Sequence, residues 1–236
     1  MTKTLKKNIR RSITGSLGRY VAILLIIMLG VAFLTGLRQT RPIMTATETD
    51  YIRRTALYDL RLLSTIGFDE DDVAAVAKSE GVTAAEGSIN ADFLLLRDDE
   101  EFVYRAHMLT GKINTPELAA GNMPASGDEC LADAGQFSED MIGQKITIAE
   151  INDADTLDLF AYREYTITGL AYSPLYLSVE RGTTSLGNGN LSGFVLIPPE
   201  GFDSEYFTEL YVKCTDDFAP YSDEYDDFIE TLSDTV

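Results

Sequence analysis

The sequence predicts an α+β protein in which one N-terminal transmembrane helix precedes a mixed strand and helix domain. Three observations predict this class: an 18-residue run without charge, amphipathic helical patterns on either side of the strand region, and several alternating apolar and polar segments separated by turns. The predicted organisation is a basic N-terminal segment (1–19), a transmembrane helix (20–37), a stalk-like helical segment (38–57) and an outer domain (58–236).

The uncharged run is Tyr20–Leu37, "YVAILLIIMLGVAFLTGL". At about 1.5 Å per residue it reaches roughly 27 Å, close to the hydrocarbon thickness of a bilayer. A cleaved signal peptide and a buried soluble helix are the alternatives, but a signal core has only about 7–15 apolar residues. The following "RQTRPIM" offers no convincing cleavage site. We therefore expect a retained span that contacts lipid along Tyr20, Leu25, Gly30 and Leu37.

Charge predicts the orientation of this span. Six basic residues and no acid precede it, whereas only Arg38 and Arg41 follow closely. Because positive flanks stay in the cytoplasm, we expect a cytoplasmic N-terminus, a cell-membrane location and an extracellular main domain. The six basic residues are Lys3, Lys6, Lys7, Arg10, Arg11 and Arg19.

The outer portion is strongly acidic. Six of the 19 basic residues precede the span, so 13 remain against all 38 acids, a formal net charge of about −25 for residues 38–236. This charge argues against a nucleic acid as partner, since a phosphate backbone requires a basic face. The bilayer that holds the span is the expected partner of the helix.

Local signals predict the order of elements after the span. Pro42 predicts a kink or break in the helix just outside the membrane. "LYDLRLLST" alternates as a half-buried strand does, and "GFDEDDVAAVAKSEGV" predicts a helix that starts at Asp69–Asp72 and ends at Gly81. A calcium site in this acidic cluster is disfavoured, because the spacing lacks the order of a calcium loop. Further strands are predicted at "ADFLLLR", "EFVYRAHML", "KITIAE", "REYTITGLAY", "GFVLIP" and "ELYVKCT".

The final segment, "SDEYDDFIETLSDTV", predicts an amphipathic helix with Ser222 as its N-cap. No C-terminal cap signal follows, which favours a fragment of a longer protein with an incomplete outer domain. The predicted apolar face of this helix comprises Tyr225, Phe228, Ile229 and Leu232.

Catalytic and metal-binding signals are weak. His107 lies inside an alternating strand without a nucleophile motif, which favours a structural or surface histidine over a hydrolase base. Cys130 and Cys214 could pair outside the cell, but two buried apolar side chains are favoured. One histidine and two scattered cysteines are a poor zinc set. We expect no catalytic residue, no metal and no cofactor.

The glycine-rich stretch "RGTTSLGNGNLSG" at 181–193 resembles a phosphate-binding loop in spacing alone. Asn188 and Gly189 stand where such a loop requires Lys and then Ser or Thr, so nucleotide binding is not predicted. We expect a structured extracellular loop, with a structural role favoured over a contact role. If it is a contact surface, its candidate residues are Arg181, Thr183, Asn188 and Asn190.

Several segments in order resemble the FtsX-like/MacB-like family of ABC transporter permeases. They are "GSLGRYVAILLIIMLGVAFLTGLRQTRPIM", "YDLRLLSTIGFDEDDV", "GNMPASGDECLAD" and "SPLYLSVERGTTSLGNGNLSGFVLIP". The resemblance covers essentially the whole chain, as the first membrane helix and most of a MacB-like core domain. It implies further membrane helices beyond this chain.

The resemblance also implies partners and a mechanism. A separate cytoplasmic ABC ATPase subunit would hydrolyse ATP, a second permease copy or paralogue would complete the membrane part, and Tyr20–Leu37 would transmit motion to the outer domain. Lys3–Arg11 would dock to the membrane surface or to the ATPase. Export, lipid or lipoprotein handling and signalling are the implied roles. A signal-anchored binding or sensor domain without transport, and a membrane-tethered hydrolase that depends on His107, are the alternatives.

Overall fold

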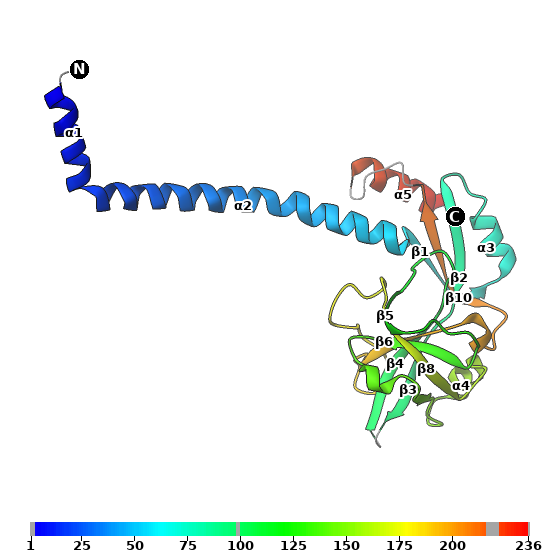
Figure 1. The fold of residues 1–236 in the computed structure, drawn as a ribbon. Coiled ribbons are helices and arrows are strands. Elements are labelled where there is room, and N and C mark those ends of the chain that lie inside the picture. Colours follow the sequence, from blue (N-terminus) through cyan, green and yellow to red (C-terminus); the bar gives the residue numbers. More distant parts are fainter. Residues whose placement is uncertain (1–2, 98–99, 216–221, 236) are drawn as a thin grey trace. The chain divides into compact units, whose positions relative to one another are not determined.

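The computed structural model of the chain describes residues 3–97, 100–215 and 222–235. The chain divides into two units, Met1–Tyr51 and Ile52–Val236, and each is described by itself. The first unit consists of α1 (Lys3–Gly15) and most of α2 (Leu17–Thr55), and the last residues of α2 belong to the second unit (Figure 1).

Helix α2 contains the apolar run and is the one helix among the described residues that is long and apolar enough to cross a membrane. Within α2 only Thr55 is buried, so the apolar window is uncovered. The sequence predicts a kink or a break at Pro42; the break is wrong, because α2 continues through this residue. A proline removes one backbone donor and crowds the carbonyl four residues earlier, at Arg38, but the rest of this 39-residue helix keeps its hydrogen bonds.

The C-terminal end of α2 is closed by a left-handed residue. Ala56 has φ 48°, and the N–H of Leu57 donates to the carbonyl of Ile52 at 3.0 Å, as in a Schellman motif. Alanine in this conformation is strained, since its Cβ approaches the carbonyl oxygen. The chain therefore turns sharply out of the helix at a position that glycine would occupy more easily.

Replacing Ala56 with glycine is expected to raise the free energy of unfolding of the outer domain by about 1 kcal/mol. Relief of about 1–2 kcal/mol of left-handed strain exceeds the extra freedom that glycine gains on unfolding. Urea denaturation of the full chain in detergent, followed by tyrosine fluorescence, measures the change. Ala74→Gly is the matched control and should cost about 1 kcal/mol, because Ala74 lies exposed inside a regular helix. Equal destabilisation by both substitutions would contradict the strain at Ala56.

The larger part of the second unit is a seven-stranded sheet with the order β3-β4-β9-β6-β8-β5 and with β7 beside β8. The pairs β4–β9 and β6–β8 are parallel and the others are antiparallel. An isolated bridge joins Leu95 to Ile148, so the sheet curls until its β7 side reaches β3. The strands are β3 (Asn90–Arg97), β4 (Glu100–Met108), β5 (Glu117–Gly121), β6 (Glu129–Asp133), β7 (Lys145–Thr147), β8 (Glu164–Tyr172) and β9 (Gly193–Ile197).

The curled sheet encloses the main core. Strand β9 is buried at every position because it lies between β4 and β6 and is covered on both faces. Large side chains from the two halves of the sheet fill the interior, and α4 (Ala154–Leu159) lies beside it. The most completely buried aromatic residues of this core are Phe93, Tyr104 and Tyr165.

A second, antiparallel sheet has the order β1-β10-β2, from β1 (Leu60–Phe68), β10 (Phe207–Cys214) and β2 (Val82–Ser88). Helices α3 (Glu70–Val76) and α5 (Asp223–Thr235) pack their apolar residues on it around Leu210 and Val212. The face predicted for α5 is confirmed at Phe228, Ile229 and Leu232, which join this core. The α+β class and the apolar N-terminal helix are thus as the sequence predicts.

Helix α3 begins as predicted but ends early. Asp69 and Asp72 form a capping box, with reciprocal hydrogen bonds of 2.9 and 3.0 Å. The end predicted at Gly81 is wrong, since the helix ends at Val76 and a tight turn follows. Gly81 serves that turn: its φ is 82°, and a Cβ there would come within 2.5 Å of the Phe228 ring.

The two cysteines are free and buried, as the favoured interpretation holds. Cys130 belongs to the core of the curled sheet and Cys214 to the core of the three-stranded sheet. Burial raises the pKa of the Cys214 thiol to about 11, so this thiol is unreactive at neutral pH.

Candidate functional site

The last residue of α2 and the residues that follow it are hydrogen-bonded to other residues of the second unit. Thr55 is 1% exposed, and its carbonyl accepts a hydrogen bond from the N–H of Thr115 at 2.8 Å. The N–H of Asn114 donates to the carbonyl of Ala56 at 3.0 Å, and the Asn114 side chain accepts from the N–H of Tyr58, also at 3.0 Å. We call these three hydrogen bonds the helix clasp. They fix the direction in which the chain enters the outer domain.

Two further residues support the clasp, Lys213 on β10 and Asp59 just before β1. Lys213 donates to the carbonyl of Leu57 at 2.9 Å and pairs with Asp59 at 3.0 Å. Asp59 also accepts from the N–H of Cys214 and from the Tyr225 hydroxyl, each at 2.8 Å. The exit of α2 is therefore joined to β10 and to α5.

Next to the clasp lies a polar cluster centred on Glu209, whose side chain is fully buried. Arg61 donates to one carboxylate oxygen at 2.6 Å through Nε, and Tyr211 donates to the other at 2.6 Å. His107 Nδ1 lies 3.7 Å from Glu209 and has no hydrogen bond to a described residue, whereas Nε2 is 2.8 Å from the Tyr176 hydroxyl. The buried carboxylate of Glu209 thus has a charged partner, Arg61, and a neutral one, Tyr211.

The pKa shifts follow from this arrangement. Burial holds the pKa of His107 below its usual value, although Glu209 acts in the opposite direction. Burial opposes the charge on Glu209 as well, but His107, Tyr211 and Arg61 together lower the pKa of the carboxyl. At neutral pH the cluster therefore contains an ionised glutamate and a neutral histidine.

The stability of the outer domain is expected to fall as the pH drops below about 6.5. The unfolded chain protonates its one histidine near pH 6.5, whereas folded His107 resists protonation until a lower pH, so the unfolded state binds more protons across that window. Urea denaturation at pH 7.5 and 5.5 measures the loss. His107→Gln should flatten this part of the pH profile, and an unchanged profile in that variant would contradict the assignment.

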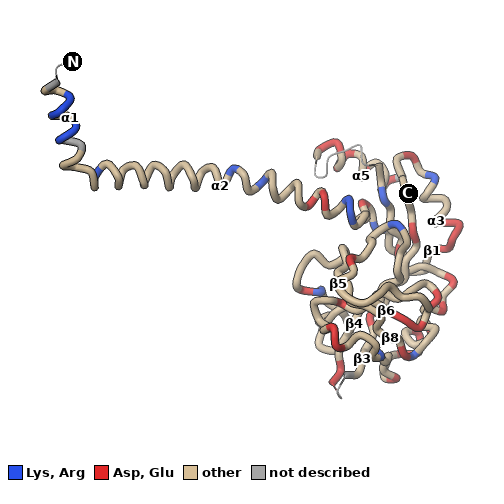
Figure 2. The backbone as a smooth tube through the Cα atoms, viewed as in Figure 1, with Lys and Arg blue, Asp and Glu red and all other residues tan. Residues whose placement is uncertain are grey.

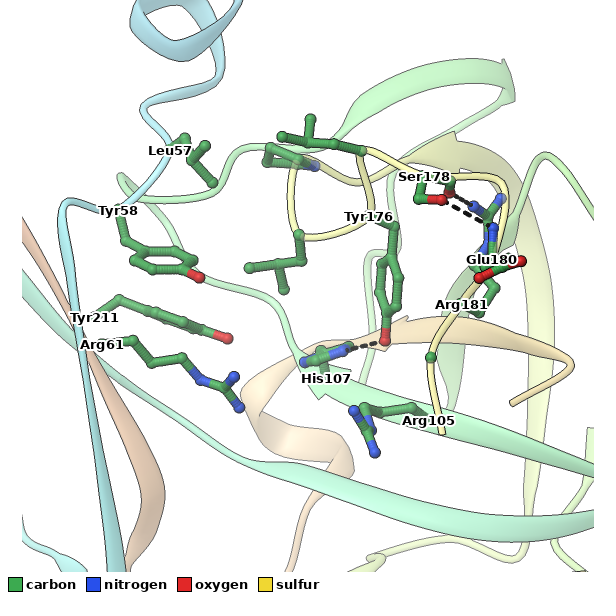
Figure 3. Close-up of a pocket in the computed structure, with 14 residues that line it drawn as sticks. Leu57, Tyr58, Arg61, Arg105, His107, Tyr176, Ser178, Glu180, Arg181 and Tyr211 are labelled. Carbon is green, nitrogen blue, oxygen red and sulfur yellow. Dashed lines mark hydrogen bonds between the residues drawn. The ribbon is translucent and has the colours of Figure 1, made fainter. Parts of the chain in front are cut away.

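Four residues of this cluster line a pocket of about 420 Å³ within the second unit, and Glu209 lies outside its lining; the four are Arg61, His107, Tyr176 and Tyr211. Figure 3 shows Tyr58 stacked beside Tyr211 on one side and Tyr176 standing opposite, with Arg61 and Arg105 on either side of His107. Arg105 binds Asp92 through two hydrogen bonds of 2.5 and 2.8 Å. The pocket combines aromatic walls with guanidinium groups.

The glycine-rich loop borders this pocket through Arg181. Its guanidinium donates to both oxygens of fully buried Asp133, at 2.6 and 2.9 Å, and to the carbonyl of Ser178 at 2.6 Å. The guanidinium carbon also lies 5.8 Å from the ring centroids of Tyr176 and Phe194, which stack on each other. The ion pair between Arg181 and Asp133 therefore connects the start of the loop to the C-terminal end of β6.

The rest of the loop forms a small turn. An isolated bridge joins Thr183 to Asn190, and the Asn188 side chain accepts from the N–H of Asn190 at 3.0 Å. Gly182, Gly187 and Gly189 have positive φ angles of 103°, 53° and 85°. Thr183, Asn188 and Asn190 are exposed, so among the four candidate contact residues they present side chains to solvent and Arg181 does not.

The predicted membrane contacts are all on α2, where Tyr20, Leu25 and Leu37 are 51%, 56% and 58% exposed. A Cβ on Gly30 would meet no atom within 4 Å. Figure 2 shows basic residues on α1 and acidic residues spread over the second unit, in line with the charge asymmetry of the sequence.

Sequence analysis did not identify Glu209, Asp133 or Asn114. Each is a buried polar residue whose partner is distant in the chain: 48 positions separate Asp133 from Arg181, and 148 separate Arg61 from Glu209. The one available signal was position, since Glu209 and Asp133 interrupt apolar strand segments.

The described residues define an α+β domain that follows a helix able to span a membrane. The structure is similar to the extracellular domain of the noncanonic ABC-type transporter YknZ from Gram-positive bacteria, with a TM-score of 0.42 and 10% identity over 72% of this chain and 80% of that one. It is also similar to the periplasmic region of MacB from Actinobacillus actinomycetemcomitans, with a TM-score of 0.42 and 10% identity over 74% of this chain and 73% of that one.

The first of these solved structures is an extracellular domain of an ABC-type transporter, and the second is a periplasmic region. At this identity and TM-score they carry no argument about function. No protein-family model and no curated protein matches the chain.

Proposed function

We propose that the chain is a membrane-spanning permease subunit of an ABC transporter complex. In this role α2 couples ATP hydrolysis by a separate cytoplasmic subunit to movement of an outer domain. The observation that carries the proposal is that α2 continues from the apolar run to Thr55 without interruption and ends in the helix clasp. The sequence resemblance to FtsX-like/MacB-like permeases supports it independently.

The physical argument is mechanical. A helix transmits displacement along its axis because each turn is hydrogen-bonded to the next, whereas a flexible linker absorbs it. The clasp fixes the end of α2 with hydrogen bonds at a buried residue. Displacement of the span therefore reaches the strands of the outer domain.

In the same proposal α1 lies in the cytoplasm, and its basic residues contact anionic lipid headgroups or the ATPase. The acidic domain lies outside the cell membrane, and a second permease copy or paralogue completes the complex. Export, lipid or lipoprotein handling, or signalling is the output of the movement.

Labelling of single cysteines in intact cells tests the proposed topology. The two native cysteines are 0% and 2% exposed and resist a membrane-impermeant maleimide, so they need no replacement. Asp203→Cys in the outer domain should react in intact cells, and Thr4→Cys in α1 should react only after permeabilisation. The reverse pattern would overturn the proposed orientation.

Purification of the chain from cell membranes tests whether an ABC ATPase binds to it. Under mild detergent an ABC ATPase should co-purify, and replacement of Lys6, Lys7, Arg10 and Arg11 by glutamine should weaken its binding. Matched glutamine substitutions at Lys78, Lys112 and Lys145 in the outer domain serve as the control. A chain that purifies without any ATPase would favour the anchored binding or sensor domain.

A further inference from the structure

The pocket beside the helix clasp is lined by arginine side chains, and the carboxylates that pair with them lie outside the lining. Arg61, Arg105 and Arg181 all line it, and each is paired with an acid that does not line it. Two of these acids are fully buried, and the third, Asp92, is 18% exposed. Glu180 is the one acidic residue among the lining residues that the structure describes.

Two of the arginines retain donors for a ligand. Arg61 uses Nε and Nη2 for Glu209, and Arg105 uses Nε and Nη2 for Asp92. Among the described residues neither has a hydrogen bond from Nη1. A guanidinium held rigidly by one carboxylate can donate to a second, because its five N–H groups point outward in one plane.

The remaining walls are apolar or aromatic. The stacked rings of Tyr58 and Tyr211, 5.2 Å between centroids, form one wall, and Tyr176 forms the opposite one (Figure 3). Leu57 and Leu177 also line the pocket, and Leu177 is 69% exposed. A volume of about 420 Å³ falls in the range of about 300–1,000 Å³ that small-molecule sites occupy.

We propose that this pocket binds a small monocarboxylate with an apolar body, whose carboxylate accepts hydrogen bonds from Arg61 and Arg105 and whose body packs between the tyrosines. A single negative charge fits better than two. The three arginine charges are already balanced by Glu209, Asp92 and Asp133, and residues 38–236 carry a net charge of about −25, so a dianion such as phosphate meets more repulsion.

The ligand would contact the residues that directly follow α2. Leu57 and Tyr58 line the pocket, and the N–H of Tyr58 takes part in the helix clasp. Ligand binding and the position of the C-terminal end of α2 are therefore expected to affect each other. Binding itself does not depend on the transporter role, so its test stands apart from the topology and ATPase experiments.

Calorimetric titration of the full chain in lipid nanodiscs tests the proposal with two pairs of probes. They are 4-phenylbutyrate against 4-phenylbutyramide, and octanoate against octanamide, with empty nanodiscs subtracted. At least one acid should bind about ten-fold or more tightly than its amide, as loss of a charge-assisted hydrogen bond predicts. The pair that shows the larger ratio distinguishes an aromatic from an aliphatic body. Ratios near one for both pairs, or no saturable binding by either acid, would overturn the proposal.

Two variants place the binding in this pocket. Arg61→Gln/Glu209→Gln removes both charges of the pair, so that neither remains buried alone, and should weaken acid binding about ten-fold without changing amide binding. Leu177→Asp adds a negative charge at the rim and should also weaken acid binding, whereas Leu177→Asn should not. Because Leu177 is exposed, this pair keeps the test valid if the double variant misfolds. Unchanged acid binding in Leu177→Asp and in a folded double variant would overturn the site.

Discussion

Replacing Arg181 with alanine is expected to destabilise the outer domain by about 3–5 kcal/mol, because it leaves a buried carboxylate without its partner. Asp133 is fully buried and accepts two hydrogen bonds from the guanidinium, which is itself 10% exposed. The N–H of Gly135 also donates to Asp133, but one backbone donor does not compensate a full charge. A loss of this size is a large fraction of the stability of a typical domain.

Urea denaturation of the full chain measures this effect, with Thr183→Ala and Asn188→Ala as controls in the same loop. Both controls change exposed side chains and should stay within about 0.5 kcal/mol. The double variant Arg181→Ala/Asp133→Ala should cost less than the sum of the single substitutions, since it leaves no lone charge. A loss below about 1 kcal/mol for Arg181→Ala would show that the arginine is a surface group available to a partner.

Interrupting α2 between the span and the helix clasp is expected to abolish the coupling while leaving both ends folded. Glycine at each of residues 44–47 costs about 1 kcal/mol relative to alanine, about 4 kcal/mol in total against a helix with alanine at all four positions, and melts that turn of the helix. Alanine at the same four positions keeps the helix and is the matched control. These positions are exposed, so neither variant disturbs a core.

Hydrogen exchange at the helix clasp reads out this coupling. In the complex with its ATPase, addition of ATP should change the exchange rate of the amides of Thr115 and Tyr58, which the clasp protects. The tetraglycine variant should lose at least nine-tenths of that change, and the tetraalanine variant should retain it. An equal response in both variants would show that motion reaches the domain by another route.

Sequence periodicity identified the elements whose signals are local. The apolar run, the capped start of α3 and the buried strand β9 are each read from consecutive residues, and each is present. Three strands were missed, β2, β5 and β6. Strands β2 and β5 are short and rich in alanine and glycine, and β6 has five residues with an acid at each end, so their apolar pattern is faint. Their pairing with distant strands makes them strands, a tertiary effect that local propensity does not contain.

The candidate site was less predictable than the fold. His107 was identified as a residue in a strand, but its burial between Glu209 and Tyr176 depends on contacts across 102 and 69 positions of the chain. The loop at 181–193 was identified by its glycines, which do adopt positive φ, but the buried pairing of Arg181 with Asp133 was not. Polar residues that pair far apart in sequence leave no periodic trace, and only folding brings them together.

The most direct test of the coupling proposal is the distance between two outer domains in the assembled complex. A spin label at Asp203→Cys on each of two copies, with the buried native cysteines left in place, reports that distance by double electron–electron resonance. We expect the distance distribution to differ between the nucleotide-free complex and the complex trapped with ATP, and the difference to vanish when residues 44–47 are glycine. Identical distributions in the two nucleotide states of the unmodified helix would contradict the proposal that α2 moves the outer domain.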